Sequence, residues 1–379
     1  MRNTLLLSLA GFFPAFVLLI LAGGLFELTE PAIGVAFVQL LVLHGFAVTL
    51  GKFGLDSILF AKARESQLHY LLKLNQALKV FIVATTFYTI FYLTSYRQLD
   101  PVAMILSTAA GVDALATVLA SSLVACRKYF NYCIVNVTLY GTLLVSLLIN
   151  NAMGGREPSL ETISAIFLVG ALAKLAMCYA VNAGLSDSDR VYYTITRREV
   201  QTTLQQVGNF AVFKCDQLYA ILIASVIAPN ILAAYVFFSK VTDILTSGAV
   251  ALNPLIYEVV GRVVSKRFLL IFLLLVVSMT TFITLSAIKE FMGFDVPLEL
   301  LFVYSSIFPL SIVINNIVIR RLGNGGVTKV IISQLVASLA IITIGYLAWV
   351  TDHQYHSLYM ILPGALILKV CYLLHSKND

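Results

Sequence analysis

The chain has 379 residues, of which 60% are hydrophobic and 12% are charged, and its mean hydropathy is +0.93. Soluble globular domains carry about 25% charged residues, so this composition excludes a soluble enzyme or binding module and indicates that lipid is the main solvent. The formal net charge is +6, but the basic residues are scattered in twos and threes, which argues against a nucleic-acid partner.

Long, unbroken apolar segments follow one another along the whole chain. A bilayer core of about 30 Å needs about 20 residues of helix, whereas membrane strands would show alternating apolar and polar residues. The segments therefore predict an all-α, polytopic integral membrane protein with about twelve transmembrane helices and membrane lipids as its neighbours. We expect spans at 4–26, 32–52, 75–96, 101–125, 131–151, 160–183, 203–227, 230–254, 267–290, 296–319, 328–350 and 357–375.

The first apolar segment, Leu5 to Phe26, follows the basic residue Arg2 and could be taken for a secretory signal. It is longer than a signal core, no small-residue cleavage site is evident, and Glu27 follows at once, so we expect a first membrane span. Pro14 lies in its middle, where it removes a backbone hydrogen bond and bends the helix. Pro14 is a hinge candidate, and a static kink is the alternative.

Basic residues are concentrated in every second loop, as the rule for cytoplasmic loops requires. The loops on the other side carry only Arg97, Arg156 and Lys289. This alternation places both termini in the cytoplasm and supports an even number of spans. The basic residues assigned to the cytoplasmic side are Arg2, Lys52, Lys62, Arg64, Lys73, Arg127, Lys128, Arg190, Arg197, Arg198, Arg262, Lys266, Arg267, Arg320, Arg321, Lys329 and Lys377.

The longest polar stretch, near residues 184–202, divides the chain into two sets of six spans. We expect an N-terminal six-helix lobe at 1–183, a cytoplasmic connecting segment at 184–202 and a C-terminal six-helix lobe at 203–379. Residues 30–38 and 228–236 are weakly similar and occupy the second span of each half. Because such duplicated bundles are common among transporters, two pseudo-symmetric lobes facing a cavity are predicted.

Charged side chains at membrane depth cost about 2.5–3.5 kcal/mol each on insertion scales, so those that remain usually face the bundle interior or a water-filled cavity. The lysines among them could hold an anionic group such as a pyrophosphate, and the alternative is internal charge pairing. The ionisable residues near the middle of the predicted spans are His44, Asp113, Lys174, Lys214, Asp216, Lys240 and Asp243.

Lys240 and Asp243 lie three residues apart on one helix, and Lys214 and Asp216 lie at a similar depth on the preceding helix. A four-residue internal salt network is therefore as reasonable as an anion-binding role for these two lysines.

Lys174 has no acidic neighbour within a helical turn of its own span, which makes it the preferred candidate for an anion contact carrying an unpaired charge. Its replacement by Ala is expected to abolish function without loss of expression. Asp113 could be a proton or sodium site, or could pair with Lys174 across the lobe. His44 could titrate near neutral pH, or could simply hydrogen-bond a backbone carbonyl.

Catalytic and cofactor motifs are not evident in the sequence. There is no Gly-rich phosphate loop, no nucleophile motif, and no metal-ligand spacing around the five cysteines. We therefore expect no enzyme activity, no catalytic residue, and no bound metal or cofactor.

Four stretches resemble Wzx-type polysaccharide flippases of the multidrug/oligosaccharidyl-lipid/polysaccharide exporter (MOP) superfamily. They are the Lys-Cys-Asp-Gln run within 213–224, the turn and helix at 234–240, the Asn-Pro-Leu-Ile-Tyr run at 253–257 and the Phe-Gly-Leu-Asp run within 52–56. The chain departs from the family pattern at Ala234, where a glycine is usual before Tyr235.

The resemblance implies a bacterial inner-membrane protein with a MATE-like, V-shaped pair of lobes that works by alternating access. It would move an undecaprenyl-pyrophosphate-linked oligosaccharide repeat unit from the cytoplasmic to the periplasmic leaflet, with H⁺ or Na⁺ as a possible coupling ion. Lys174, Lys214 and Lys240 would bind the pyrophosphate, and Asp113, Asp216, Asp243 and His44 would serve ion coupling or a charge network. Other membrane proteins of polysaccharide assembly would be its partners.

Two further functions remain open from the sequence. A cation-coupled multidrug exporter of the same superfamily would be expected to carry mainly acidic cavity residues, because its usual cargo is cationic. A membrane glycan polymerase or ligase would be expected to carry a large outer loop, which this chain does not show.

Overall fold

The computed structural model describes residues 31–52, 54–66, 68–155, 157–183, 190–193 and 267–292, together with isolated positions between 17 and 29 and between 298 and 372. By its internal contacts the chain divides into two units, Met1–Gly208 and Asn209–Asp379. The bounds predicted for the two lobes and for the connecting segment 184–202 stay predictions, because most residues around them lie outside the described ranges.

The first unit contains six helices and two short strands within its described residues. They are α2 (Pro31–Gly51), α3 (Leu55–Ser66), β1 (His69–Leu72), α4 (Leu74–Tyr96), α5 (Pro101–Ala125), α6 (Tyr129–Ala152), α7 (Leu160–Ala183) and β2 (Arg190–Tyr193). In the second unit α11 spans Arg267–Met292, and its Phe282 ring lies 6.3 Å from that of Phe302.

The long helices confirm the spans predicted at 32–52, 75–96, 101–125, 131–151, 160–183 and 267–290, with ends within two residues of those expected. Within the described residues α4, α5, α6 and α7 are each long and apolar enough to cross a bilayer. The chain is thus a multi-pass, helical membrane protein, as its composition indicates.

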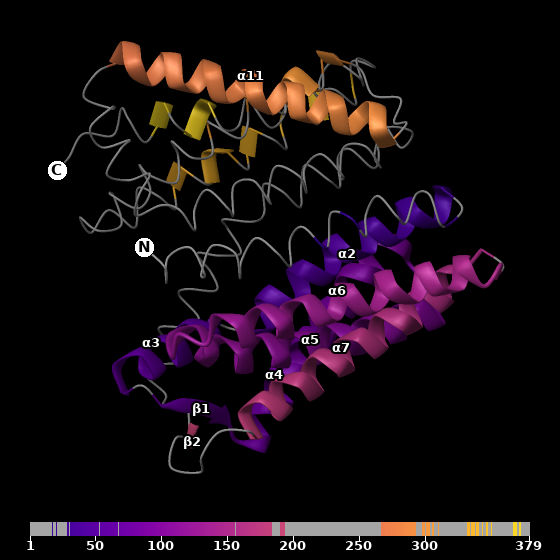
Figure 1. The fold of residues 1–379 in the computed structure, drawn as a ribbon. Coiled ribbons are helices and arrows are strands. Elements are labelled where there is room, and N and C mark those ends of the chain that lie inside the picture. Colours follow the sequence, from indigo (N-terminus) through magenta and orange to yellow (C-terminus); the bar gives the residue numbers. More distant parts are fainter. Residues whose placement is uncertain are drawn as a thin grey trace. The chain divides into compact units, whose positions relative to one another are not determined.

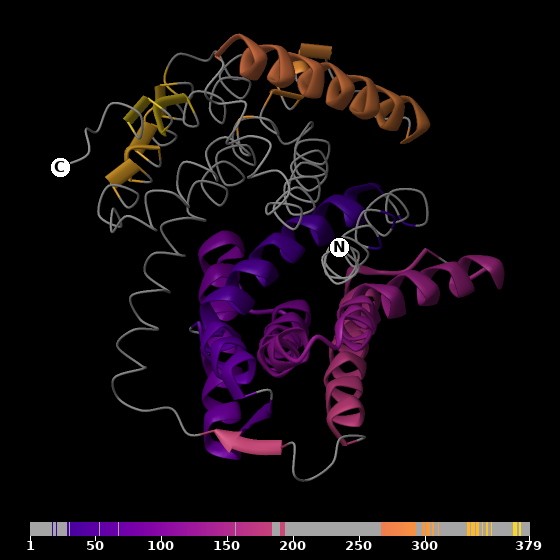
Figure 2. The same ribbon diagram turned by 60° about the vertical axis from the view of Figure 1, so that its left-hand side comes forward.

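Helix α5 is the centre of the first unit, and it packs against α2, α3, α4, α6 and α7. Figures 1 and 2 show these helices running side by side in one bundle. The side chains of α5 are small over much of its length, with fully buried alanines at Ala109, Ala110, Ala114, Ala116 and Ala120. Small residues let helix backbones approach closely, which is how helices associate where lipid is as apolar as the protein interior.

The ends of the helices follow local sequence signals. Helix α5 begins with Pro101 after Asp100, whose Oδ1 accepts a hydrogen bond of 2.8 Å from the Ala103 backbone N–H. Arg97 after α4 and Arg127 after α5 adopt left-handed conformations, with φ of 56° and 59°. Helix α7 begins after Pro158, and the Ser159 hydroxyl accepts from the Thr162 N–H at 3.2 Å.

A short helix and a two-stranded sheet are additions that the sequence did not lead us to expect. Gly54, with a φ of 69°, turns the chain from α2 into α3, where Lys52 Nζ donates to Asp56 Oδ2 at 2.7 Å. Strands β1 and β2 pair in parallel, with His69 opposite Arg190 and Leu72 opposite Tyr193. Figure 2 shows the β2 arrow at one end of the bundle. The sheet fastens the start of the segment after α7 to the loop before α4.

Candidate functional site

Three helices of the first unit bring three ionisable side chains to one level. His44, Asp113 and Lys174 lie on α2, α5 and α7, each about 18–21 Å along its helix from the end at Pro31, Pro101 or Leu160, at a rise of about 1.5 Å per residue. The predicted topology has these three helices starting at the same membrane surface. Equal depth on three mutually packed helices lets the side chains meet, although 61 residues separate Asp113 from Lys174.

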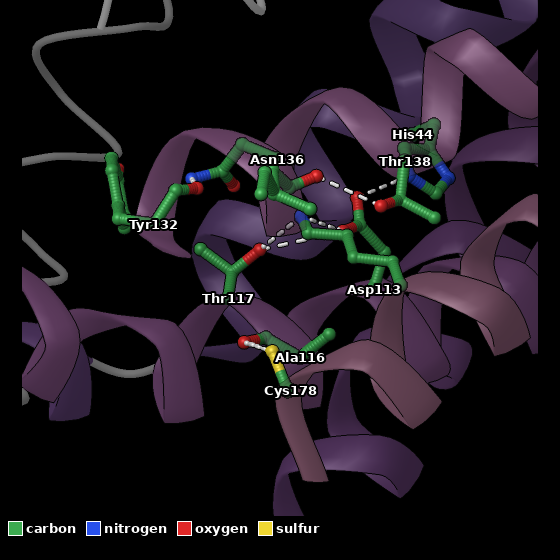
Figure 3. A network of polar contacts seen from close by, with 10 residues as sticks. His44, Asp113, Ala116, Thr117, Tyr132, Asn136, Thr138 and Cys178 are labelled. Carbon is green, nitrogen blue, oxygen red and sulfur yellow. Dashed lines mark hydrogen bonds and ion pairs between the residues drawn. The ribbon is translucent and has the colours of Figure 1, made fainter. Parts of the chain in front are cut away.

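Asp113 is the hub of this buried cluster. Lys174 Nζ donates to Asp113 Oδ1 at 2.5 Å, and His44 Nε2 lies 2.9 Å from Asp113 Oδ2. Figure 3 shows the carboxylate of Asp113 with its contacts to His44 and Thr117. The three ionisable residues are nearly inaccessible, with exposed fractions of 2% for His44 and 5% each for Asp113 and Lys174.

Thr117 completes the cluster and was not singled out from the sequence. Its Oγ1 accepts a hydrogen bond of 3.0 Å from Lys174 Nζ and donates to Asp113 Oδ1 at 3.3 Å. Thr117 lies one helical turn after Asp113 on the same face of α5, and this spacing is the only sequence signal that could have identified it.

The cluster is surrounded by aromatic rings. Phe167 of α7 meets the His44 ring edge-on with the centroids 4.9 Å apart, and Tyr88 of α4 meets it at 6.4 Å. Phe37 also packs edge-on against Phe167, with the centroids 5.7 Å apart, and the ring of Tyr140 of α6 lies 6.3 Å from that of Phe167. These rings exclude water, so the charges of Asp113 and Lys174 interact in a medium of low dielectric constant.

The structure corrects one expectation about Lys174. Its charge was expected to be unpaired, but the ammonium group is held by Asp113 and Thr117. The alternative of pairing across the lobe describes the geometry, because Asp113 and Lys174 face each other from adjacent helices. A role for Lys174 in anion binding stays a prediction.

The remaining candidate residues lie outside the described part of the chain. They are Pro14, Lys214, Asp216, Lys240 and Asp243. Among the described residues, no three His, Cys, Asp or Glu side chains gather where they could share a metal ion.

A second feature of the first unit is a groove of about 560 Å³ along α6. Its lining is mostly apolar and made of small side chains, with Gly141 at its middle and Phe130 at one end. The described lining residues are Phe130, Cys133, Ile134, Val137, Thr138, Gly141, Thr142, Val145 and Ser146. Such a surface suits an apolar chain better than a polar ligand.

No protein-family model and no curated protein matches the chain. Its fold, in contrast, is similar to solved structures over nearly its whole length. A MOP superfamily transporter from Pyrococcus furiosus matches with a TM-score of 0.58 and 12% identity, over 98% of this chain and 94% of that one. A MATE protein in complex with MaD5 matches with a TM-score of 0.60 and 13% identity, over the same shares of the two chains.

A multidrug resistance MATE family transporter in an outward-facing conformation gives a TM-score of 0.55 at 13% identity, again over 98% and 94% of the two chains. At such low identity the similarity concerns the fold. The chain therefore has the all-α, polytopic fold of MOP superfamily transporters.

Proposed function

We propose that this protein is a membrane transporter of the MOP superfamily that flips an undecaprenyl-pyrophosphate-linked oligosaccharide from the cytoplasmic to the periplasmic leaflet of a bacterial inner membrane. The observation that carries transport is the similarity of fold over 98% of the chain. The choice of cargo rests on the flippase-like stretches and on the lysines at membrane depth. Both termini lie in the cytoplasm in this proposal, and the lobes work by alternating access.

The pairing of Lys174 changes how the anionic headgroup is held in this proposal. A lysine that is already shared by Asp113 and Thr117 has little capacity left for a pyrophosphate. We therefore propose that Lys214 and Lys240 bind the headgroup, and that Asp216 and Asp243 partly balance the positive charge of these lysines. The role of Lys174 in this proposal is to neutralise Asp113 and to hold α7 against α5 in the first unit.

The groove along α6 supports a lipid-linked cargo. Its lining residues extend from Phe130 to Ser146, a length of about 24 Å at about 1.5 Å per residue, which matches much of one bilayer core. A polyprenyl chain could lie along this groove without needing a polar partner, whereas a small water-soluble drug would not need a surface of this length.

A cation-coupled multidrug exporter is the second candidate, and the observation that favours it is the similarity to a multidrug resistance MATE transporter. The transporter from Pyrococcus furiosus, however, is described as having a binding pocket of reverse polarity that suggests a different function. The fold thus accommodates more than one cargo polarity, and the cavity charges must decide between the candidates.

The test is leaflet-specific translocation in proteoliposomes of a fluorescent polyprenyl-pyrophosphate oligosaccharide. We expect protein-dependent appearance of the glycan on the opposite face, lost in the Lys214→Ala/Lys240→Ala variant. Gly141→Leu should slow translocation by filling the groove. Gly141→Ala is the matched control, because a Cβ at this position meets only Val137 Cγ1 at an ordinary 3.5 Å. No translocation, combined with efflux of small organic cations, would favour the multidrug exporter instead.

A further inference from the structure

The hydrogen bonding of the buried cluster defines the proton positions on His44. The carboxylate of Asp113 can only accept hydrogen bonds, so Nε2 of His44, at 2.9 Å from Oδ2, carries a hydrogen and donates it. A neutral imidazole has one N–H, so Nδ1 then carries the lone pair. This nitrogen is buried and has no hydrogen-bond partner among the residues that the structure describes. His44 therefore holds a basic atom that its structural contact with Asp113 does not use.

A second unpartnered polar group lies against the same ring. Within the described part of the chain the buried Tyr88 hydroxyl has no hydrogen-bond partner, and the centroids of the Tyr88 and His44 rings are 6.4 Å apart. The large majority of buried side-chain polar atoms in proteins find a partner, and each exception calls for an explanation. Among the described residues five buried side-chain atoms lack a partner, and two of them, on His44 and Tyr88, belong to rings that contact each other between α2 and α4. A basic nitrogen beside a free hydroxyl is an arrangement that can bind and pass on a proton.

Tyrosines connect this contact to the end of the bundle where α4 ends. Tyr88, Tyr92 and Tyr96 follow one another at one-turn spacing on α4, with ring centroids 6.2 Å and 4.6 Å apart. Exposure rises along the row, from 0% for Tyr88 through 2% for Tyr92 to 37% for Tyr96.

The outer members of the row are hydrogen-bonded to polar groups near the surface. The Tyr92 hydroxyl donates to Asp100 Oδ2 at 2.7 Å, and the Tyr96 hydroxyl donates to Gln39 Oε1 at 3.3 Å. The tyrosine row, defined as Tyr88, Tyr92 and Tyr96, thus offers polar atoms from the solvent-exposed end of α4 to the His44 ring.

Each helix packed against α2 places a polar or charged side chain close enough to His44 to be affected by its charge. Helix α4 presents Tyr88, α5 presents Asp113, and α7 presents Lys174, with Tyr140 of α6 behind Phe167. With His44 neutral, Asp113 and Lys174 balance each other. Protonation of His44 adds one positive charge, and imidazolium and ammonium then compete for a single carboxylate.

Sodium is a poorer candidate than a proton for this site. A sodium ion would need the oxygens of Asp113 and Thr117, and both are already bound by the ammonium of Lys174. A proton needs only the lone pair of Nδ1.

We propose that Nδ1 of His44 is a proton-binding site that is reached from the α4 side along the tyrosine row, and that its protonation loosens the Lys174–Asp113 pair. The site is a coupling site for a proton, and it does not depend on the cargo assigned above. In a transporter it would make the conformation of the first unit sensitive to the pH on one side of the membrane.

The direct test is nitrogen NMR of the purified protein labelled with ¹⁵N-histidine, since the chain has only five histidines. On acidification of the sample we expect one histidine to start as the Nε2–H tautomer and to gain a proton on Nδ1. That signal should be absent in His44→Gln, whose amide still donates to Asp113. If His44→Gln does not fold, replacing the other four histidines singly by Gln assigns the signal by elimination.

The route is tested with Tyr88→Phe, which keeps the ring and removes a hydroxyl that has no partner to lose. We expect proton exchange at His44 to slow several-fold, whereas Tyr70→Phe, in β1, should leave it unchanged. An Nδ1–H tautomer at high pH, or a His44 signal that does not respond to acidification, would overturn the site. Unchanged exchange in Tyr88→Phe would overturn the route. Because the measurement uses no cargo, its outcome is separate from the test of the flippase.

Discussion

Helices α5 and α6 follow each other in the chain, have 25 and 24 residues and are almost equally apolar, yet their environments are opposite. In the apolar stretch of α5, 72% of the residues are buried within the protein, against 22% in α6. The difference lies in side-chain size. Helix α5 has alanine, glycine and serine on several faces, whereas α6 buries one row of larger residues, Val135, Leu139, Leu143 and Leu147.

The comparison teaches that hydropathy locates membrane helices but does not rank them by burial. Lipid tails are as apolar as leucine, so association depends on close packing and on polar contacts between helices. Asp113 lies on α5, which is surrounded by other helices. Its carboxylate can therefore find a partner on two of them, His44 on α2 and Lys174 on α7. Variants that change charge, volume or hydroxyl groups on the central helices or on the peripheral α6 should therefore differ in their effect on the free energy of unfolding.

The largest expected effect is the loss of one partner of the Asp113–Lys174 pair. Lys174→Ala or Asp113→Ala leaves an unpaired charge in the most buried part of the bundle, at a cost of about 3–5 kcal/mol of unfolding free energy. Thermal unfolding in detergent measures it. Lys174→Ala was expected from the sequence to spare expression; the pairing predicts low yield instead.

The matched controls are a neutral double variant and a more exposed ion pair. Asp113→Asn/Lys174→Met removes both charges and should recover most of the stability. Lys52→Met, which breaks the i,i+4 pair with Asp56 at the end of α2, should cost less than about 1 kcal/mol. A double variant that is as unstable as the single variants would contradict the charge argument.

The next effect concerns the close approach of α2 to α4. A Cβ on Gly51 would meet the backbone of Ala84, with its N at 2.9 Å and its Cα at 2.7 Å, and backbone cannot move aside as a side chain can. Gly51→Ala should therefore destabilise the unit by about 3 kcal/mol, the upper end of the usual overpacking cost. A Cβ on Gly45 of the same helix meets nothing within 4 Å among the described residues, so Gly45→Ala should change stability by less than about 1 kcal/mol. Equal unfolding temperatures for the two variants would contradict this contact.

The sequence predicts the membrane helices of this protein well, but it predicts the contacts between their side chains much less well. The apolar runs and the loop charges predict the helices α2, α4, α5, α6, α7 and α11, because burial in lipid imposes a length and a composition on each segment. The cost of charge at membrane depth singled out His44, Asp113 and Lys174 in advance. Lys214, Asp216, Lys240, Asp243 and Pro14 stay predictions, since they lie outside the described residues.

The sequence left the partners within the cluster open, with pairing of Asp113 and Lys174 across the lobe as one alternative, because a helix that is apolar all round carries no signal for which face meets which neighbour. Lys174 and Asp113 are 61 residues apart, and nothing in their own spans indicates the pairing. Helix α3 and the β1–β2 pair were missed for a different reason. They are short elements, and the strand pairing joins segments that are far apart in sequence.

On the peripheral helix, two neighbouring leucines should separate packing against protein from packing against lipid. Leu147 of α6 is 1% exposed and Leu148 is 50% exposed. Leu147→Ala should cost about 2 kcal/mol, the lower end of the range for buried leucines, because lipid replaces water as the reference solvent and only the cavity contribution remains. Leu148→Ala should cost much less, since lipid tails fill the space. Unfolding in lipid nanodiscs compares them, and equal losses would contradict the assignment of α6 to the periphery.

The smallest effect concerns the hydroxyl that completes the cluster on α5. Thr117→Val keeps the shape of the side chain but removes an acceptor from the Lys174 ammonium and a donor to Asp113, which should cost about 1.5 kcal/mol. Thr86→Val is the control on α4, where the hydroxyl donates only to the Ile82 carbonyl on an exposed face, and its effect should stay below about 0.5 kcal/mol. The variant Asp113→Asn/Lys174→Met lacks both charged groups to which the Thr117 hydroxyl bonds. Adding Thr117→Val to that variant should therefore lower its stability by almost nothing further. Additive losses in that triple variant would show that Thr117 contributes to packing rather than to the charge network.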